Sequence, residues 1–315
     1  MTNRILSDRA KSVLKLSNEE RIEALIQETV FVHPAFENVH RKLEKLLKYS
    51  PSQTTRHFML IGDTGLGKST ILDTFASKYG LFQNLDHPDG PRVELPVLYL
   101  PIPADTTLRK LELFMADKLN ASLLRRPSKD EVTLEISRKI TEFNVRMIVL
   151  DEIQHINAAQ NSREWSALKD FIKDIANRHH IPVVIGGLPE IALRLVSTDA
   201  QLKRRFFGNV IRLSPWKRSA GLRDLLEEIE ETLPLRKRSN LNSEAMMEII
   251  EKSTSGSIDE IYFCIRLAAE EAIRTGKERI TPKQFSEIRK SLNLPFILEP
   301  GIADDSRGGH GAKAS

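Results

Sequence analysis

The chain has 315 residues, 40% of them hydrophobic, and 47 basic side chains nearly offset 43 acidic ones, which leaves a net charge of +4. This composition excludes a wholly disordered chain, and so small a charge excess is only a weak indication of a polyanionic partner. No apolar run approaches the roughly 18 residues of a membrane span, no apolar signal core opens the chain, and the single cysteine, Cys264, cannot form an internal disulfide. We therefore expect a cytoplasmic protein that does not engage a membrane.

Residues 1–50 are expected to form helices that lead into the main domain. Ser17 followed by acidic residues is typical of a helix N-terminus, and apolar residues then recur at helical spacing. After Pro34 a second amphipathic stripe runs from Phe36 to Leu47. Each apolar face is expected to pack against the rest of the protein or against a partner.

Between residues 51 and 213, short apolar runs alternate with longer segments of helical pattern. Runs that are apolar throughout are typical of strands buried on both faces, and strands that alternate with helices form parallel sheets. We therefore predict an α/β fold with a parallel five-stranded sheet, whose strands lie at residues 57–61, 97–100, 147–150, 182–185 and 209–213. The segment 81–96 is rich in Pro, Gly and Asp and is predicted to be an exposed loop.

The strand pattern ends near residue 214, and the segments beyond it favour helices. Thr281-Pro282 is a strong start signal, because threonine caps a helix and proline suits its first turn. We predict a small all-helical domain over residues 214–297, with helices at 222–233, 243–253, 258–275 and 281–292. The polar, Gly-rich residues 298–315 are predicted to form a flexible tail.

Residues 62–69 match the pattern GxxxxGK[ST], directly after an apolar strand and before a helical segment. This setting is what a phosphate-binding loop, or P-loop, requires, and a chance glycine-rich turn rarely has it. The glycines allow backbone N–H groups to face phosphate oxygens, the helix N-terminus adds its positive dipole end, and Lys68 can reach the β- and γ-phosphates. The predicted ATP-binding residues are Gly62, Asp63, Thr64, Gly65, Leu66, Gly67, Lys68, Ser69 and Thr70.

An acidic pair, Asp151-Glu152, follows the apolar run at 147–150. A carboxylate at the tip of a buried strand can, with the hydroxyl of Ser69, ligate the Mg²⁺ that accompanies ATP. The adjacent Glu152 is placed to orient or deprotonate the attacking water, so we assign catalytic roles to Lys68, Asp151 and Glu152. Such pairs also occur without function, and it is the P-loop upstream that favours ATP hydrolysis.

Other polar residues carry weaker signals. Three histidines near strand ends lack the Cys/His spacing of a zinc site, namely His155, His179 and His180. Basic runs can steer a polyanion but fit a solvated surface equally well, and they lie at residues 203–205, 217–218 and 236–238.

The ordered set of motifs resembles the TniB/TnsC group of AAA+ transposition ATPases over most of residues 17–297. Many ATPases share the Walker motifs, whereas the combination with the lead-in and lid patterns is much more specific. The matching segments are Arg21-Ile22 and Phe31–Phe36 in the lead-in, Phe58–Thr70 and Val149–His155 at the Walker motifs, Ile185–Glu190, Gln201–Phe206, and Gly256–Ala272 with Gly276 and Ile280-Thr281 in the lid.

This resemblance implies a bacterial AAA+ core followed by a helical lid, with ATP assembling subunits into rings or helical filaments on duplex DNA. It implies that the assembly marks a target and recruits the transposase, that a TniQ-like targeting protein is a further partner, and that ATP hydrolysis drives disassembly. Arg205 would be the arginine finger that reaches a neighbouring subunit's γ-phosphate, which couples hydrolysis to assembly. The alternative for Arg204 and Arg205 is a plain basic surface or a DNA contact.

Two positions depart from the family pattern. Gly187 follows the strand at 183–186, where the family often has a polar sensor-1 residue, and no arginine follows Gly256 closely enough for a sensor-2 role. Both gaps predict slow intrinsic turnover that a partner stimulates, without loss of ATP binding.

Candidate DNA contacts lie after the second strand, in a region that the resemblance places at the pore of a ring. Phosphate contacts need cations, hydroxyls or backbone amides, and this segment offers them near a helix start. The candidates are Thr106, Thr107, Arg109 and Lys110. An ordinary helix cap with solvated charges explains the same residues.

Three other functions fit parts of the sequence. A helicase loader or replication initiator would share the AAA+ core, although nothing like a winged helix follows the lid pattern. A small-molecule kinase would need an acceptor pocket, and the acidic pair instead favours water as the nucleophile. A nucleotide switch without nucleic acid remains open, and stimulation of ATP hydrolysis by DNA distinguishes it from the leading hypothesis.

Overall fold

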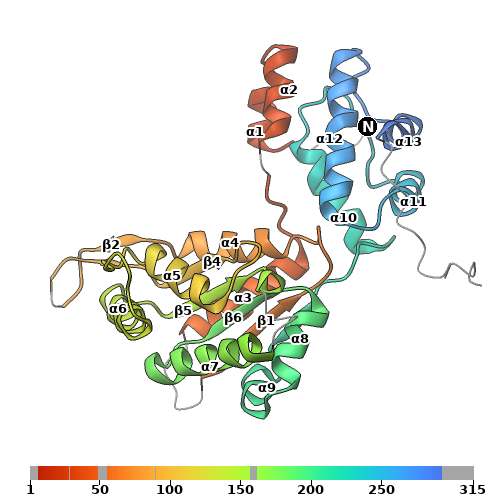
Figure 1. Ribbon diagram of the computed structural model, residues 1–315. Coiled ribbons are helices and arrows are strands. Elements are labelled where there is room, and N and C mark those ends of the chain that lie inside the picture. The colour runs from red at the N-terminus through yellow and green to blue at the C-terminus, as the bar shows by residue number, and fades with distance from the viewer. Residues whose placement is uncertain (1–5, 28, 49–54, 89, 157–161, 293–315) are drawn as a thin grey trace, which may run out of the picture.

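The computed structural model describes residues 6–27, 29–48, 55–88, 90–156 and 162–292, which form an α/β domain and a helical domain (Figure 1). The helical domain stands beyond one end of the sheet, at the upper right in the figure. The predicted tail, residues 298–315, lies outside the described residues, as does the last part of the lid predicted to reach residue 297. Within the described residues, no helix is long and apolar enough to cross a membrane.

Five parallel strands form the central sheet, which confirms the predicted fold class. The strand order is β4-β5-β6-β1-β7. β6 therefore lies between β1, which precedes the P-loop, and β5, which precedes the acidic pair. The strands are β1 (Phe58–Ile61), β4 (Val97–Pro101), β5 (Met147–Asp151), β6 (Val183–Gly187) and β7 (Val210–Arg212).

Both faces of the sheet are covered, because successive strand side chains point to opposite faces. In β1, Phe58 and Leu60 join one buried cluster, while Met59 and Ile61 join the other. The first cluster is closed by α3 (Pro34–Lys48) and α4 (Lys68–Lys78). The second is closed by α5 (Leu108–Lys118), α6 (Lys129–Glu142), α7 (Ser162–His179), α8 (Pro189–Ser197) and α9 (Ala200–Phe206).

The segment 81–96 is more ordered than the predicted exposed loop. It contains an antiparallel hairpin of β2 (Phe82–Asn84) and β3 (Arg92–Glu94). Glu94 is buried and accepts hydrogen bonds from the side-chain amides of Asn84, at 2.8 Å, and Asn144, at 3.0 Å. The contact with Asn84 lies within the hairpin, and the contact with Asn144 anchors the hairpin to a distant turn, which a count of Pro, Gly and Asp does not detect.

Up to residue 292, where the described part of the chain ends, the helical domain contains four helices after β7, namely α10 (Ala220–Thr232), α11 (Glu244–Ser253), α12 (Ile258–Arg274) and α13 (Pro282–Ser291). Their apolar faces form a third buried cluster that includes Cys264. The Thr281 side chain caps α13 by accepting from the Gln284 amide, with Pro282 at the first helical position.

The N-terminal helices divide between the two domains, although residues 1–50 were expected to act as one lead-in. α1 (Asp8–Val13) packs against α10, and α2 (Asn18–Ile26) packs against α12, whereas α3 packs on α4. Arg21 of α2 is fully buried, and its guanidinium donates to the Glu278 carboxylate at 2.9 Å. The lid therefore includes the first two helices of the chain.

Candidate nucleotide-binding site

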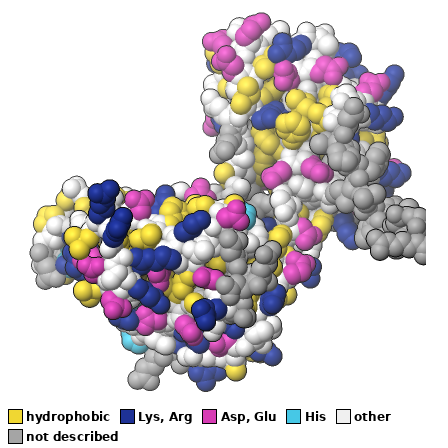
Figure 2. Space-filling model, in the orientation of Figure 1, with side chains coloured by type: hydrophobic (Ala, Val, Ile, Leu, Met, Phe, Trp, Pro, Cys, Tyr) yellow, Lys and Arg dark blue, Asp and Glu magenta, His cyan; other side chains and the backbone are white. Residues whose placement is uncertain are grey.

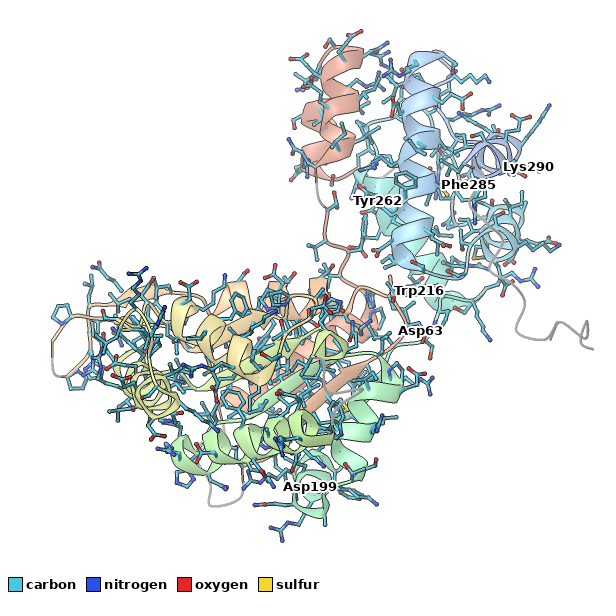
Figure 3. The ribbon with its side chains drawn as sticks, viewed as in Figure 1. Asp63, Asp199, Trp216, Tyr262, Phe285 and Lys290 are labelled. Carbon is cyan, nitrogen blue, oxygen red and sulfur yellow. The ribbon has the colours of Figure 1, made fainter. Side chains whose placement is uncertain are left out.

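The P-loop joins β1 to α4 at the end of the sheet that faces the helical domain, where Figure 3 labels Asp63. Gly65 and Gly67 have φ angles of 75° and 81°, a left-handed conformation that side-chain-bearing residues rarely adopt. Lys68 is only 4% exposed, and its ammonium donates to the Asp63 carbonyl at 2.8 Å. A buried cation and the N-terminus of α4 together make a cradle that fits a phosphate anion.

The acidic pair reaches the same cradle. Asp151 is fully buried and accepts from the Tyr99 hydroxyl and from the Glu152 amide, both at 2.9 Å. Burial raises the pKa of the Asp151 carboxyl, and hydrogen bonds from Ser69 and Tyr99 oppose that shift. Glu152 accepts from the Ser69 hydroxyl at 3.0 Å, so the structure brings these predicted residues together. A hydroxyl and a carboxylate beside a phosphate cradle are the ligands that Mg²⁺ takes in nucleotide sites.

Two glycines at the end of β6 make room for this arrangement. A Cβ atom on Gly186 would lie 2.3 Å from Oδ1 of Asp151, and one on Gly187 would lie 2.6 Å from Cγ2 of Ile153. A side chain at position 186 would displace Asp151, and one at position 187 would displace Ile153 and Gln154, which follow the acidic pair. The sensor-1 gap noted at Gly187 therefore coincides with space that the side chains of Ile153 and Gln154 occupy.

The helical domain contacts the P-loop through the start of α12. The Ser257 hydroxyl donates to the Gly65 carbonyl at 3.0 Å, and the Asp259 amide approaches the same oxygen at 3.4 Å. The sequence has no arginine close enough after Gly256 for a sensor-2 role, and Asp259 lies at this place instead. Partial burial raises the pKa of the Asp259 carboxyl, and the positive charge of Lys68 opposes the shift.

A small cavity continues from the P-loop between the two domains. Its volume is about 70 Å³, which is below the roughly 300–1,000 Å³ of ordinary ligand pockets, so a nucleotide base can enter only if its walls separate. The cavity is lined by Thr29, Phe31, His33, Phe36, Gly67, Thr70, Ile71, Ile258, Asp259 and Tyr262.

Sequence reasoning missed the residues of this cavity that lie outside the P-loop. The resemblance at Phe31–Phe36 marked part of the segment but assigned it no role. In the structure the His33 ring accepts at Nδ1 from the Phe36 amide at 3.3 Å, and burial lowers the pKa of His33. The rings of His33 and Trp216 also pack edge to face, with their centroids 5.1 Å apart. This contact joins the lead-in to the start of the lid.

A larger cavity of about 370 Å³ lies between α5, α6 and α7, with Glu112 and His179 among its lining residues. None of the predicted nucleotide-site residues line it. Although this cavity is the larger of the two, it is therefore not the predicted nucleotide site.

Arg205 does not reach outward as an arginine finger would. It is 6% exposed and donates to the Asn177 side chain, and its Nε and one terminal nitrogen have no hydrogen-bond partner among the described residues. Arg205 shares the buried face of α9 with Leu202 and Phe206, while Arg204 is exposed. Helical spacing thus places Arg205 inward and its neighbour outward.

The candidate DNA-binding residues also differ in exposure, since one is buried and the others reach the surface. Thr106 is 3% exposed and donates to the Pro103 carbonyl at 2.6 Å, so it cannot contact DNA from this position. Thr107 caps α5 by accepting from the Lys110 amide at 3.3 Å. Arg109 donates to the Pro127 carbonyl at 2.6 Å, and the exposed Lys110 donates to the Asp105 carbonyl at 3.1 Å.

Solved structures of similar fold are known. The Cdc6p protein of Pyrobaculum aerophilum matches with a TM-score of 0.61 and 20% identity, covering 91% of this chain and 72% of that one. The ORC2 protein of Aeropyrum pernix, solved as ADPNP-ADP complexes, matches with a TM-score of 0.60 and 15% identity over 87% and 72% of the two chains. The ORC1 protein of A. pernix, solved in complex with DNA, matches with a TM-score of 0.55 and 17% identity over 86% and 69%. At such identities the likeness shows the fold.

The sequence itself identifies the family. No curated protein matches the chain. A family model described as bacterial TniB protein matches residues 21–218, well over half of the chain, and this span contains the P-loop, the acidic pair and α9. The chain therefore belongs to the bacterial TniB family and is an AAA+ ATPase.

Proposed function

We propose that this protein is an ATP-dependent, DNA-binding regulator of transposition that assembles on duplex DNA as a ring or helical filament. The assembly marks target DNA and recruits the transposase, a TniQ-like targeting protein is a further candidate partner, and ATP hydrolysis drives disassembly. The observation that carries the proposal is that Ser69, Asp151 and Glu152 meet beside Lys68 in a chain of the TniB family.

The residues of this site have distinct proposed roles. Lys68 and the amides of residues 65–69 bind the phosphates, and Ser69 and Asp151 hold Mg²⁺. The metal supplies positive charge that offsets the charge of the phosphates. Glu152 orients the attacking water and accepts its proton. Hydrogen bonds from Tyr99 and the Glu152 amide hold the Asp151 carboxylate in place at the end of β5.

We also propose that an arginine of α9 completes the site of a neighbouring subunit. Arg204 is exposed and can act without rearrangement, whereas Arg205 would have to leave its buried contact with Asn177. Arg204→Ala should lower ATP turnover at high protein concentration and leave ATP affinity unchanged. If only Arg205→Ala does so in a folded protein, the finger is Arg205 and α9 must rearrange on assembly.

For DNA we propose contacts at the start of α5. Of the four candidates, Thr107, Arg109 and Lys110 remain accessible to some degree. Figure 2 shows Lys and Arg side chains, interspersed with acidic ones, on the face of the α/β domain that carries α5. Fold likeness to the A. pernix ORC1 protein, solved in complex with DNA, is compatible with this proposal.

Electron microscopy tests the proposal most directly. The protein should form ordered rings or filaments when duplex DNA and a non-hydrolysable ATP analogue are both present. Lys68→Ala is the matched control and should form none. Assembly that needs the analogue but not DNA would favour a nucleotide switch, and ATP turnover without any DNA binding would contradict the proposal.

A further inference from the structure

Gln154 bridges the catalytic carboxylate and the next strand. It lies in the short 3₁₀ helix η1 (Ile153–His155), directly after Glu152. Its amide NH₂ donates to Oε2 of Glu152, and its carbonyl accepts from the Leu188 amide at 3.2 Å. This orientation of the amide is the one that satisfies both partners, because a carboxylate can only accept and a backbone N–H can only donate.

The side chain of Gln154 occupies the place of the absent sensor-1 side chain. A Cβ atom on Gly187 would lie 2.8 Å from Oε1 of Gln154, so a side chain at position 187 would require the amide of Gln154 to move from its place. The polar group that a related ATPase would supply from β6 thus comes from η1 in this chain. In either case, a hydrogen-bonding group lies between β6 and the acidic pair.

Glu152 depends on such support. Its backbone is left-handed, with a φ of 58°, which a non-glycine residue keeps only when its surroundings hold it. Of its two carboxylate oxygens, one accepts from Ser69 and the other from Gln154. Since Ser69 is also a proposed metal ligand, Gln154 is the side-chain contact that stays free to hold Glu152 during hydrolysis.

The start of α8 strengthens this contact. Leu188 is the N-cap of α8 and provides no side-chain cap, so the positive end of the helix faces the carbonyl of Gln154. Polarisation of one end of an amide makes its NH₂ group a better donor. The contact therefore links a movement of the β6–α8 turn to the orientation of Glu152.

We propose that Gln154 is a positioning residue for ATP hydrolysis, because its amide ties Glu152 to the β6–α8 turn in place of a sensor-1 side chain. The inference rests on the proposed role of Glu152 as the residue that activates water. It explains how this ATPase can do without a polar side chain at position 187.

Single-turnover hydrolysis and ATP affinity, measured on the full chain with duplex DNA, test this role. Gln154→Ala should lower the hydrolysis rate about 10- to 100-fold, as expected when a catalytic group is misplaced, and leave ATP affinity within about twofold. Gln154→Glu should also shift the acid limb of the pH–rate profile to higher pH, because two adjacent carboxylates share a proton. A merely structural role would lower ATP affinity together with the rate, whereas a positioning role lowers the rate alone.

His155→Ala is the matched control, because the His155 ring bonds the Ile102 carbonyl at 2.8 Å and not the Glu152 carboxylate. The only bond from His155 to Glu152 among those described joins the backbone amide to the Glu152 carbonyl at 2.9 Å, and the alanine variant keeps it. The proposal is overturned if His155→Ala slows hydrolysis as much as Gln154→Ala, or if Gln154→Glu keeps the parental pH profile. If Gln154→Ala does not fold, Gln154→Glu keeps the side-chain volume and decides by its pH profile. Failure of the parental protein to hydrolyse ATP would instead refute the proposed function.

Discussion

The two sides of the nucleotide site differ in how they are built. The phosphate side consists of residues 62–70 with Asp151 and Glu152, so two short stretches of sequence supply it. The lid side consists of residues 29–36 and 257–262, which are far apart in the chain and meet only in the folded protein. Short contiguous motifs supply the residues proposed to bind phosphate, whereas the contacts of the lid with this site depend on how two domains pack.

Glu152→Gln tests the phosphate side with the largest expected effect. We expect hydrolysis to fall about 100- to 10,000-fold, because the variant keeps the hydrogen bond from Ser69 but loses the base. ATP binding should persist, and the ATP-bound assembly should be trapped. Hydrolysis at the parental rate would show that another group activates the water.

Lys68→Ala tests the same side at the binding step. Removal of a buried cation that is proposed to bind the phosphates should weaken ATP binding about 100-fold or more, as measured by calorimetry. ATP-dependent assembly should be lost with it. Unchanged affinity for ATP would mean that the nucleotide binds elsewhere and that residues 62–70 are not its phosphate site.

Arg21→Ala tests whether the first helices belong to the lid side. Breaking the buried pair with Glu278 should lower the free energy of unfolding by about 3–5 kcal/mol near neutral pH, as measured by urea denaturation. Arg21 lowers the pKa of Glu278, so the contribution of the pair is full above the ordinary value of 4.5 and is lost as the pH falls through the lowered pKa. The difference between variant and parent should therefore shrink in acid. Equal stability at neutral pH would contradict the packing of α2 on the lid.

Asp259→Asn tests the lid side at the phosphates. The carboxylate lies near Lys68 and opposes a triphosphate, so its removal should strengthen ATP binding by roughly 3- to 10-fold at low salt. Because the pKa of Asp259 is raised, protonation relieves the repulsion as the pH falls, and the advantage of the variant should diminish toward acid pH. Weaker binding by the variant would mean that Asp259 contacts the nucleotide favourably.

Lys110→Glu has the smallest expected effect and concerns the proposed DNA surface. We expect the affinity for duplex DNA to fall a few-fold. The slope of log affinity against log salt concentration should become shallower by the amount expected for about one phosphate contact. Lys118→Glu, at the other end of α5, makes the same charge change and is the control. Equal losses of DNA affinity in both variants would mean that net charge, and not a contact made by Lys110, causes the effect.

Much of the fold could be predicted from local patterns. All five predicted strands occur within a residue or two of their expected ends, because buried parallel strands are apolar throughout. Helices α10–α13 also lie where periodicity and caps placed them. The hairpin of β2 and β3 was missed because its anchor, the contact of Glu94 with Asn144, joins distant segments.

The candidate site was predictable to the extent that its residues are neighbours in sequence. The inward position of Arg205 follows from its helical spacing to Leu202 and Phe206, but its contact with Asn177 depends on how α9 docks on α7 and was not predictable. The role of Gly187 was equally hidden, since its meaning depends on side chains from η1 that occupy the adjacent space.

By itself the sequence determined the parallel sheet and the positions of the proposed phosphate-binding loop and the acidic pair, because hydrogen-bonding backbone, charge and apolar periodicity act within a few residues. Only the tertiary structure decided that the first two helices join the lid, that Asp259 faces the P-loop and that Gln154 holds Glu152. Those contacts join residues from separate elements, and their geometry follows from domain packing, which local pattern does not specify.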